Sequence, residues 1–185
     1  MNKTAADRTL IEQVDRLFQP GGQGSRWYGI HVKPRCEKKA ASACSDRQIR
    51  HYLPLRRSTP KPRKGQRRYS FDVPLLPGYL FACCDVAERQ ALLNSGYLVQ
   101  IIEVVDQTLL LNELRQIYMA SSGPTDLTIY PQLKRGRVVR VIRGPLRGVA
   151  GKISARKDVF RLVLNISLLG TAVAAEVDMD DVEII

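Results

Sequence analysis

The sequence has few of the residues that metal sites and nucleophilic catalysis require. Its 185 residues include two histidines, no C-x-x-C pair and four cysteines, which are Cys36, Cys44, Cys83 and Cys84. A structural zinc site needs four well-placed thiolates or imidazoles, and the adjacent Cys83 and Cys84 would point to opposite faces of a strand. We therefore expect no metal and no cofactor, and we interpret the cysteines as reduced, buried thiols.

Catalytic motifs and long hydrophobic runs are also missing. No P-loop, G-x-S-x-G or H-E-x-x-H motif occurs. The carboxylates near the C-terminus would suit a magnesium nuclease, but solvent-facing residues on an edge strand explain them better; they are Asp178, Asp180, Asp181 and Glu183. No apolar run reaches the roughly 18 residues of a membrane helix, and no signal-peptide core is visible. We expect a cytoplasmic, non-enzymatic monomer without a membrane partner.

The positive charge is concentrated in one segment. The formal net charge is +11, and residues 33–69 alone carry +11, with thirteen Lys/Arg against two acids, whereas residues 70–132 carry −5. Clustered charge of one sign indicates a polyanionic partner such as nucleic acid. A solvated loop that binds nothing is the alternative.

Residues 26–120 have the pattern of an α+β domain. Residues 1–25 end in a flexible linker composition and are predicted to be a tail with one short helix around 10–18. A basic hairpin is predicted at 58–72. Periodicity and turn residues predict strands at 26–33, 49–57, 74–84 and 97–105, and helices at 36–48, 86–96 and 111–122, the last capped by Asn112.

The C-terminal segment is rich in short strands. Residues 121–132 are predicted to be a linker, and residues 133–185 to form a small five-stranded β-barrel. Alternation places five apolar side chains on one face of a strand; they are Phe160, Leu162, Leu164, Ile166 and Leu168. The next residue, Leu169, is then expected to point outward.

Three stretches in this order resemble the NusG family of transcription elongation factors. "RWYGIHVKP" and "LLPGYLFA" are similar to its N-terminal domain, and "GRVVRVIRGPLRGVAGKI" is similar to its KOW motif. The resemblance implies a mixed sheet flanked by helices, a flexible linker and an SH3-like five-stranded barrel. "PLLPGYLF" is more like the specialised RfaH and UpxY-type paralogs than housekeeping NusG, which stays an alternative. An RNA-binding, ribosome-associated KOW protein is the other hypothesis.

The resemblance also implies partners and a function. The N-terminal domain would bind the clamp helices of the largest subunit of RNA polymerase and suppress pausing and termination. The matching positions are His31, Leu76, Pro77, Tyr79 and Phe81. Alternation puts Tyr79 and Phe81 on the polymerase side and Leu80 and Ala82 in the core, whereas plain two-sided core packing is the alternative.

Further positions are assigned to nucleic acid and to a second partner. Lys33 and Arg35, flanked by the loop of Asn94 and Ser95, match the place that faces the non-template DNA strand of the transcription bubble; a solvated helix start is the alternative. The hairpin residues assigned to upstream duplex DNA or polymerase are Arg63, Lys64, Arg67 and Arg68; charge for solubility is the alternative. In the KOW segment, Leu169 matches the contact to the ribosomal protein NusE or the termination factor Rho. Arg143 and Arg147 flank the Gly144–Pro145 turn and are assigned to contacts with RNA or with acidic groups of a protein partner.

Overall fold

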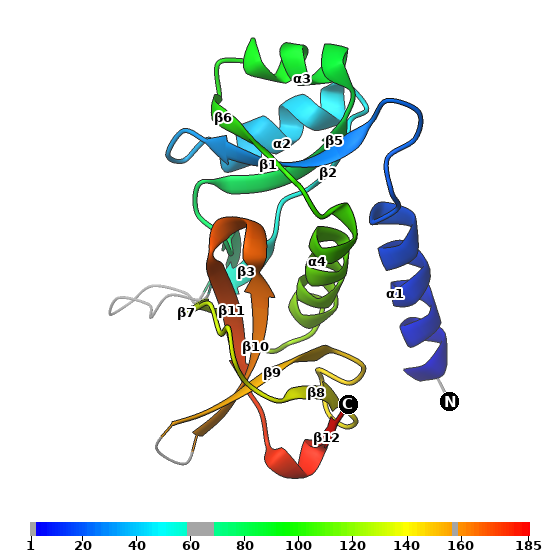
Figure 1. Cartoon of the computed structure of the whole chain (residues 1–185), viewed down its shortest axis with the longest axis vertical. Coiled ribbons are helices and arrows are strands. Elements are labelled where there is room, and N and C mark those ends of the chain that lie inside the picture. Colours follow the sequence, from blue (N-terminus) through cyan, green and yellow to red (C-terminus); the bar gives the residue numbers. More distant parts are fainter. Residues whose placement is uncertain (1–2, 59–68, 157–158) are drawn as a thin grey trace.

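The computed structural model describes residues 3–58, 69–156 and 159–185, and Figure 1 shows two sheets that lie one above the other. The helices are α1 (Lys3–Leu17), α2 (Glu37–Asp46), α3 (Val86–Leu93) and α4 (Gln107–Ser121). The strands of the upper half are β1 (Arg26–Val32), β2 (Arg50–Tyr52), β3 (Leu55–Ser58), β4 (Phe71–Pro74), β5 (Tyr79–Cys84) and β6 (Leu98–Glu103). Those of the lower half are β7 (Thr128–Pro131), β8 (Val138–Val141), β9 (Ala150–Arg156), β10 (Val159–Ile166), β11 (Thr171–Glu176) and β12 (Val182–Ile184), with 3-10 turns η1 (Ser167–Leu169) and η2 (Met179–Asp181). The predicted α+β class is confirmed.

The upper sheet is antiparallel and separates its side chains as the alternation predicts. Its strand order is β2-β5-β1-β6, with Gly29 opposite Phe81 and Ile30 opposite Leu80. Even-numbered residues of β1 and β5 pack with α2 and α3, whereas odd-numbered residues face α4 and the C-terminal half. Cys83 and Cys84 accordingly lie on opposite faces, as expected.

The N-terminal segment is more ordered than the predicted tail. α1 has 15 residues and packs against α4 and β2. Phe18, which follows it, is fully buried, and its ring meets those of Trp27, Tyr52 and Tyr118 at centroid distances of 6.0, 5.1 and 5.7 Å. The sequence did not predict this contact because Phe18 directly precedes "QPGG", whose composition is typical of a flexible linker.

The start of α4 and the end of α3 differ from the predicted helix ends. α4 begins at Gln107, with the Asp106 carboxylate accepting from the Leu109 N–H, so that Asn112 lies inside the helix and is not its N-cap. α3 begins after Asp85, which forms a reciprocal capping box with Glu88. It ends at Leu93, three residues before the predicted Gly96.

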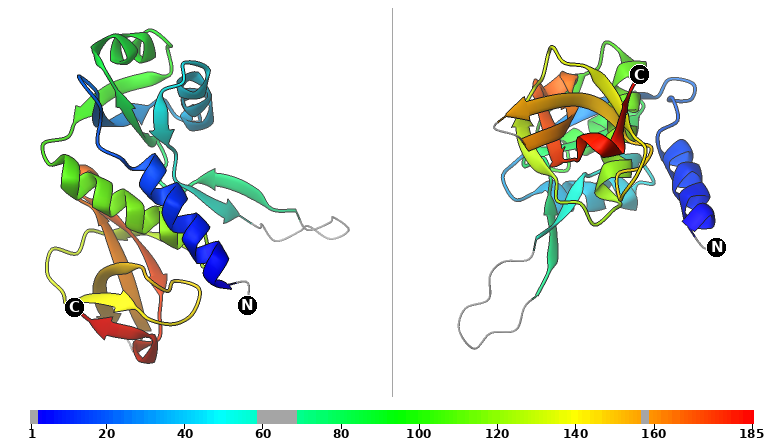
Figure 2. Two further views of the ribbon diagram at one scale, coloured as in Figure 1. Left: turned by 90° about the vertical axis from the view of Figure 1, so that its right-hand side faces the viewer. Right: turned by 90° about the horizontal axis from the view of Figure 1, so that it is seen from below.

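The predicted second strand is two strands in different sheets. β2 belongs to the upper sheet, and β3, which follows Pro54, pairs only with β4 among the described residues. Together β3 and β4 form a two-stranded ribbon that stands out from the body in Figure 2. Proline cannot donate a ladder hydrogen bond, so Pro54 is a natural place for the chain to leave the sheet. Arg63, Lys64, Arg67 and Arg68 lie outside the described residues.

The C-terminal half is an open sheet in the described residues. Its order is β12-β8-β9-β10-β11-β7, and no described residues join the edge strands β12 and β7 into the predicted closed barrel. β7 lies within the predicted linker, where it pairs Ile129 with Val173 after the buried Leu127. The linker prediction missed it because four residues ending in proline give almost no periodic signal.

A continuous hydrophobic cluster joins the two halves. It contains Trp27 and Phe81 of the upper sheet, Leu114 and Ile117 of α4, and residues of the lower sheet such as Ile166. α4 packs along β10, and Gln116 accepts a hydrogen bond of 2.8 Å from the Ala150 N–H. The boundaries of two separate domains stay a prediction, but the two halves are docked in this structure.

Candidate functional site

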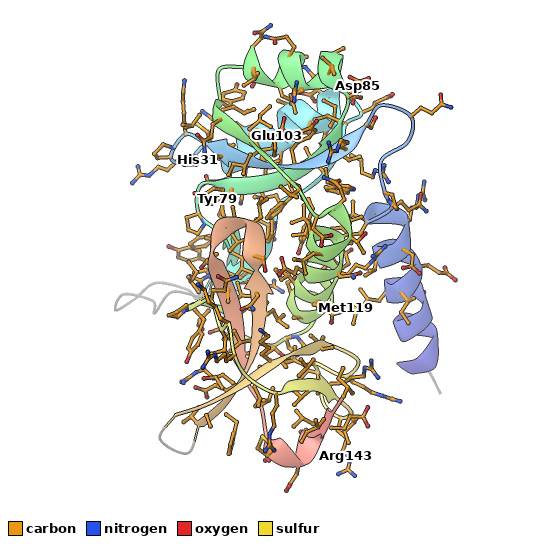
Figure 3. The ribbon with its side chains drawn as sticks, viewed as in Figure 1. His31, Tyr79, Asp85, Glu103, Met119 and Arg143 are labelled. Atoms are coloured by element: carbon orange, nitrogen blue, oxygen red, sulfur yellow. The ribbon has the colours of Figure 1, made fainter. Side chains whose placement is uncertain are left out.

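The predicted polymerase-binding residues lie around the turn before β5 and on its odd-numbered face. Leu76 is 3% exposed and Phe81 is 0% exposed, whereas Pro77 is exposed and Tyr79 is half-buried. His31 of β1 lies opposite Tyr79, and their rings stack at 5.0 Å with an interplanar angle of 19° (Figure 3). The structure therefore brings all five together but leaves both Leu76 and Phe81 out of reach of a partner.

The turn from Leu75 to Gly78 is fixed by hydrogen bonds from three segments. The Leu75 N–H donates to Pro54, and the Val32 N–H donates to Gly78 at 2.9 Å. The Gly78 N–H donates to the carboxylate of Glu37 at 2.8 Å. Gly78 has φ +83°, which glycine adopts without strain. These bonds hold Pro77 at the surface beside the His31–Tyr79 stack.

Glu37 was not among the residues that the sequence singled out. Its side chain is the one buried charged group among the described residues, at 7% exposure. A buried carboxylate must be hydrogen-bonded to be tolerated, and its bond to the Gly78 N–H meets that need. Its position in the first turn of α2 is ordinary for an acid, so the sequence carried no signal of this longer-range role.

The tip of the lower sheet covers the same face. A Cβ built on Gly29 would lie 2.7 Å from the Leu168 Cδ2, so the Leu168 side chain occupies the space that the glycine leaves open. Glu113 of α4 accepts from the Ser167 N–H at 2.9 Å and from its hydroxyl at 2.6 Å. Burial raises the pKa of Glu113, while both Ser167 bonds lower it. The tip is thus fastened to α4 and the upper sheet by apolar and polar contacts.

The residues predicted to contact the second partner are placed differently from one another. Leu169 is half-buried and packs against the joined cluster, which contradicts its predicted outward orientation because the chain forms the 3-10 turn η1 there. Arg143 and Arg147 are exposed at the far end of the lower sheet, where Figure 3 labels Arg143. The two arginines therefore lie apart from Leu169 (Figure 3).

The residues predicted to face DNA form one surface from two loops. The Lys33 N–H donates to Tyr97 at 2.9 Å, which ties the turn after β1 to the loop before β6. Lys33, Arg35 and Asn94 are exposed and Ser95 is half-buried. Arg35 has φ +62°, an uncommon conformation for a side chain of its size. The two positive groups and the two polar side chains are thus available on one edge of the upper sheet.

A polar groove of about 1020 Å³ lies between the β3–β4 ribbon and the C-terminal end of α4. Arg56, Arg57 and Ser58 line one side, and hydroxyls of Ser121 and Ser122 line the other. Sequence reasoning missed this groove because it forms between segments about 60 residues apart. No group of three metal-binding side chains is found in the part of the chain that the structure describes.

A family model decides what the upper half is. The model described as "Transcription termination factor nusG" matches residues 25–118. The chain belongs to the NusG family. Its members are non-enzymatic transcription elongation factors, and the resemblance of "RWYGIHVKP" and "LLPGYLFA" to the family is confirmed. The KOW-like stretch lies outside the matched residues, and the paralog type is left open.

Solved structures of low sequence identity are also similar to this NusG-family chain. One, described as domain interaction in Thermotoga maritima NusG, is 17% identical, covers 88% of this chain and 98% of its own, and has a TM-score of 0.48. Conformation B of the MjSpt4:Spt5 complex is 16% identical over 86% of this chain and 96% of its own, at 0.30. Conformation A of the same complex is 15% identical, covers 86% of this chain and 97% of its own, and has a TM-score of 0.28. No curated protein matches.

The NusG match covers only part of the candidate residues. His31, Lys33, Tyr79, Phe81 and Asn94 fall inside residues 25–118, as do their neighbours, whereas α1 and the whole lower sheet fall outside.

In the described residues, no helix has both the length and the apolar character needed to span a membrane.

Proposed function

We propose that this NusG-family protein binds RNA polymerase through the odd-numbered face of β5 and suppresses pausing and termination. The observation that carries the proposal is the packing of Leu76, Tyr79 and Phe81 in one apolar cluster on the odd-numbered side of a NusG-type sheet. A helix binds a partner by laying its apolar face in a hydrophobic groove. The clamp helices of the largest polymerase subunit are the partner that the family resemblance assigns to this face.

Binding in this way requires the lower sheet to move. Phe81 is fully buried, and the η1 tip rests on Gly29, directly opposite Phe81 in the sheet. The described arrangement is therefore the closed form in this proposal, and the open form presents the β5 face. A partner shifts such an equilibrium only by binding the open form more tightly, which the uncovered apolar face provides.

Nucleic acid is the second partner of the upper half. Lys33 and Arg35 would contact phosphates of the non-template strand, with Asn94 and Ser95 beside them. Phosphate contacts provide affinity without sequence choice, and their positive charge fits the +11 of residues 33–69. Arg63, Lys64, Arg67 and Arg68 would extend this field toward upstream duplex DNA or the polymerase.

The lower sheet would bind NusE or Rho in the open form. Leu169, which is half-buried in the closed form, is the apolar contact in this proposal. Arg143 and Arg147 lie at the other end of the sheet, so they would contact acidic groups away from Leu169. The motif "PLLPGYLF" favours a specialised, operon-specific antiterminator over housekeeping NusG.

In vitro transcription with purified polymerase on a paused template tests the function. We expect the full-length protein to shorten pauses and raise readthrough, and Lys33→Ala with Arg35→Ala to reduce this effect. Lys134→Ala with Arg135→Ala removes two exposed positive charges between β7 and β8 and is the matched control. Unchanged pausing and readthrough with wild-type protein would sink the proposal, and retention by ribosomes alone would favour the ribosome-associated alternative.

A further inference from the structure

The β3–β4 ribbon carries a pair of exposed, stacked aromatic rings. Tyr69 is 60% exposed and Phe71 is 44% exposed, and their ring centroids are 5.8 Å apart at an interplanar angle of 21°. Figure 2 shows that the ribbon stands clear of both sheets. Large rings gain most when they are buried, so two exposed rings side by side mark a surface for a partner.

Strand register places an arginine on the same face as the rings. Phe71 lies opposite Ser58 and Val73 lies opposite Arg56, so Arg56 shares the face of Phe71 and Tyr69. Arg57 is on the other face, where its Nε donates to the Ser70 hydroxyl at 3.1 Å. Arg56 is exposed, and no described residue hydrogen-bonds to its guanidinium. We call Arg56, Tyr69 and Phe71 the ribbon face.

The charge around the ribbon face indicates an anionic partner. Among the described residues of the ribbon, Arg56 and Arg57 are cationic and exposed, and Asp72 is the one acid. Exposed rings beside positive charge are the combination with which proteins bind single-stranded nucleic acid, since any base can stack on a ring and the phosphates are attracted to the cations. A duplex offers no free base faces along its length, so the rings would gain nothing from it.

We propose that the ribbon face binds single-stranded RNA, with a base stacked on the Tyr69–Phe71 pair and Arg56 on an adjacent phosphate. The choice of RNA rests on the proposed function, because the transcript is the strand that leaves an elongating polymerase unpaired. The ribbon face belongs to a different sheet from Lys33 and Arg35, so this is a second nucleic-acid surface. It gives the factor a contact with the transcript that does not use the β5 face.

The test measures binding of the full-length protein to a short, unstructured, fluorescent RNA without polymerase. Tyr69→Ala with Phe71→Ala should weaken binding about tenfold or more, the loss of one stacked base, with an unchanged salt slope. Tyr69→Phe should retain binding, because stacking does not need the hydroxyl. The salt slope is the slope of log binding constant against log salt concentration. Arg56→Ala should reduce its magnitude by about 0.7, the value for one phosphate contact on a single strand. Ile11→Ala with Ile129→Ala, which removes two other exposed apolar side chains, should leave binding unchanged.

A second arm uses the same RNA with its bases removed. The wild-type protein should bind this abasic strand no more tightly than the double alanine variant binds the intact strand. Equal affinity of the wild type and the double alanine variant for intact RNA would overturn the proposal, as would a variant that loses only polymerase binding. Tighter binding of the same sequence as DNA would overturn the choice of RNA. Because polymerase is absent, these results are separate from the transcription assay.

Discussion

Ser167 donates two hydrogen bonds to the carboxylate of Glu113, from its N–H at 2.9 Å and from its hydroxyl at 2.6 Å. This pair fastens the η1 tip of the lower sheet to α4. The neighbouring Leu168 side chain packs against Gly29 of the upper sheet. Hydrogen bonds to a charged group contribute about 1.5–3 kcal/mol when buried, and the partial exposure here places them at the low end. In the proposed function, this contact would hold the closed form without preventing it from opening.

Removing the acceptor should shift the protein toward the open form. We expect Glu113→Ala to raise amide hydrogen exchange in η1 and at the ends of β10 and β11, and to tighten binding to purified polymerase. Glu103→Ala, which removes a surface carboxylate 3.5 Å from Arg89, is the matched control. Unchanged exchange in η1 would mean that the Ser167 bonds do not hold the tip.

The same carboxyl predicts a pH dependence. Burial raises the pKa of Glu113 above its ordinary 4.5, so the folded protein keeps this proton where the unfolded chain has lost it. The contribution to stability is full below 4.5 and is lost as the pH rises through the raised pKa. Urea unfolding should show that the free energy of unfolding falls more steeply between about pH 4 and about pH 7 for wild type than for Glu113→Gln, because glutamine does not titrate. Parallel curves would contradict the shift.

Gly29 and Leu168 should be energetically coupled. Gly29→Ala places a Cβ where the Leu168 Cδ2 now lies 2.7 Å away, and such overpacking costs about 1–3 kcal/mol. Leu168→Ala makes room, so the double variant should be more stable than the sum of the single changes predicts, by about 0.5–3 kcal/mol. Gly22→Ala, where a Cβ would meet nothing within 4 Å, controls for the glycine substitution itself. Additive effects in urea unfolding would show that the tip does not rest on Gly29.

The N-terminal helix should stabilise the fold through Phe18. Phe18→Ala removes a fully buried ring and should cost about 3–5 kcal/mol of unfolding free energy. It should also shift the emission of Trp27, the single tryptophan, to the red. Ile11→Ala on the same helix changes a side chain that is 55% exposed, so its cost should stay within about 0.5 kcal/mol. Equal effects of the two changes would mean that α1 is not anchored by Phe18.

Thiol reactivity should separate Cys36 from the other cysteines. Burial raises the pKa of Cys44 to about 11 and that of Cys84 to about 12, and it raises the pKa of Cys83 as well. The thiolate is the reactive form, and only Cys36 is half-exposed. Iodoacetamide followed by mass spectrometry should give one fast adduct at Cys36, and four after unfolding. A fast adduct at Cys83 or Cys84 would contradict the packing of β5.

The sequence predicted β1 and β5, and it also predicted which of their side chains share a face of the sheet. β1 and β5 alternate through Trp27, Ile30, Leu80 and Phe81, and two-residue periodicity assigns each to its face whatever the partner is. It failed at α4, where Asp106 is the cap but "LLLN" offered Asn112 as a second reasonable start. A local pattern of this kind predicts that a helix is present, but it does not always predict the residue at which the helix begins.

What the sequence did not predict depends on contacts between distant segments. Phe81 is buried in a cluster that includes residues of α4 and of the lower sheet, all distant in the sequence, and Gly29 gave no sign of leaving space for Leu168. The sixth strand of the lower sheet follows from β7 pairing with β11, two short strands about 40 residues apart. Periodicity describes one element at a time, so it carries no information on such pairings.

Site-specific photo-crosslinking tests the polymerase contact most directly. A benzophenone amino acid in place of Pro77, which is exposed beside the Tyr79 stack, would be irradiated in a purified elongation complex. The same group in place of Val86, which is 70% exposed on α3, is the control. We predict a crosslink from position 77 to the largest polymerase subunit and none from position 86. A crosslink from position 86 alone, or none from position 77 while pausing is still suppressed, would contradict the account.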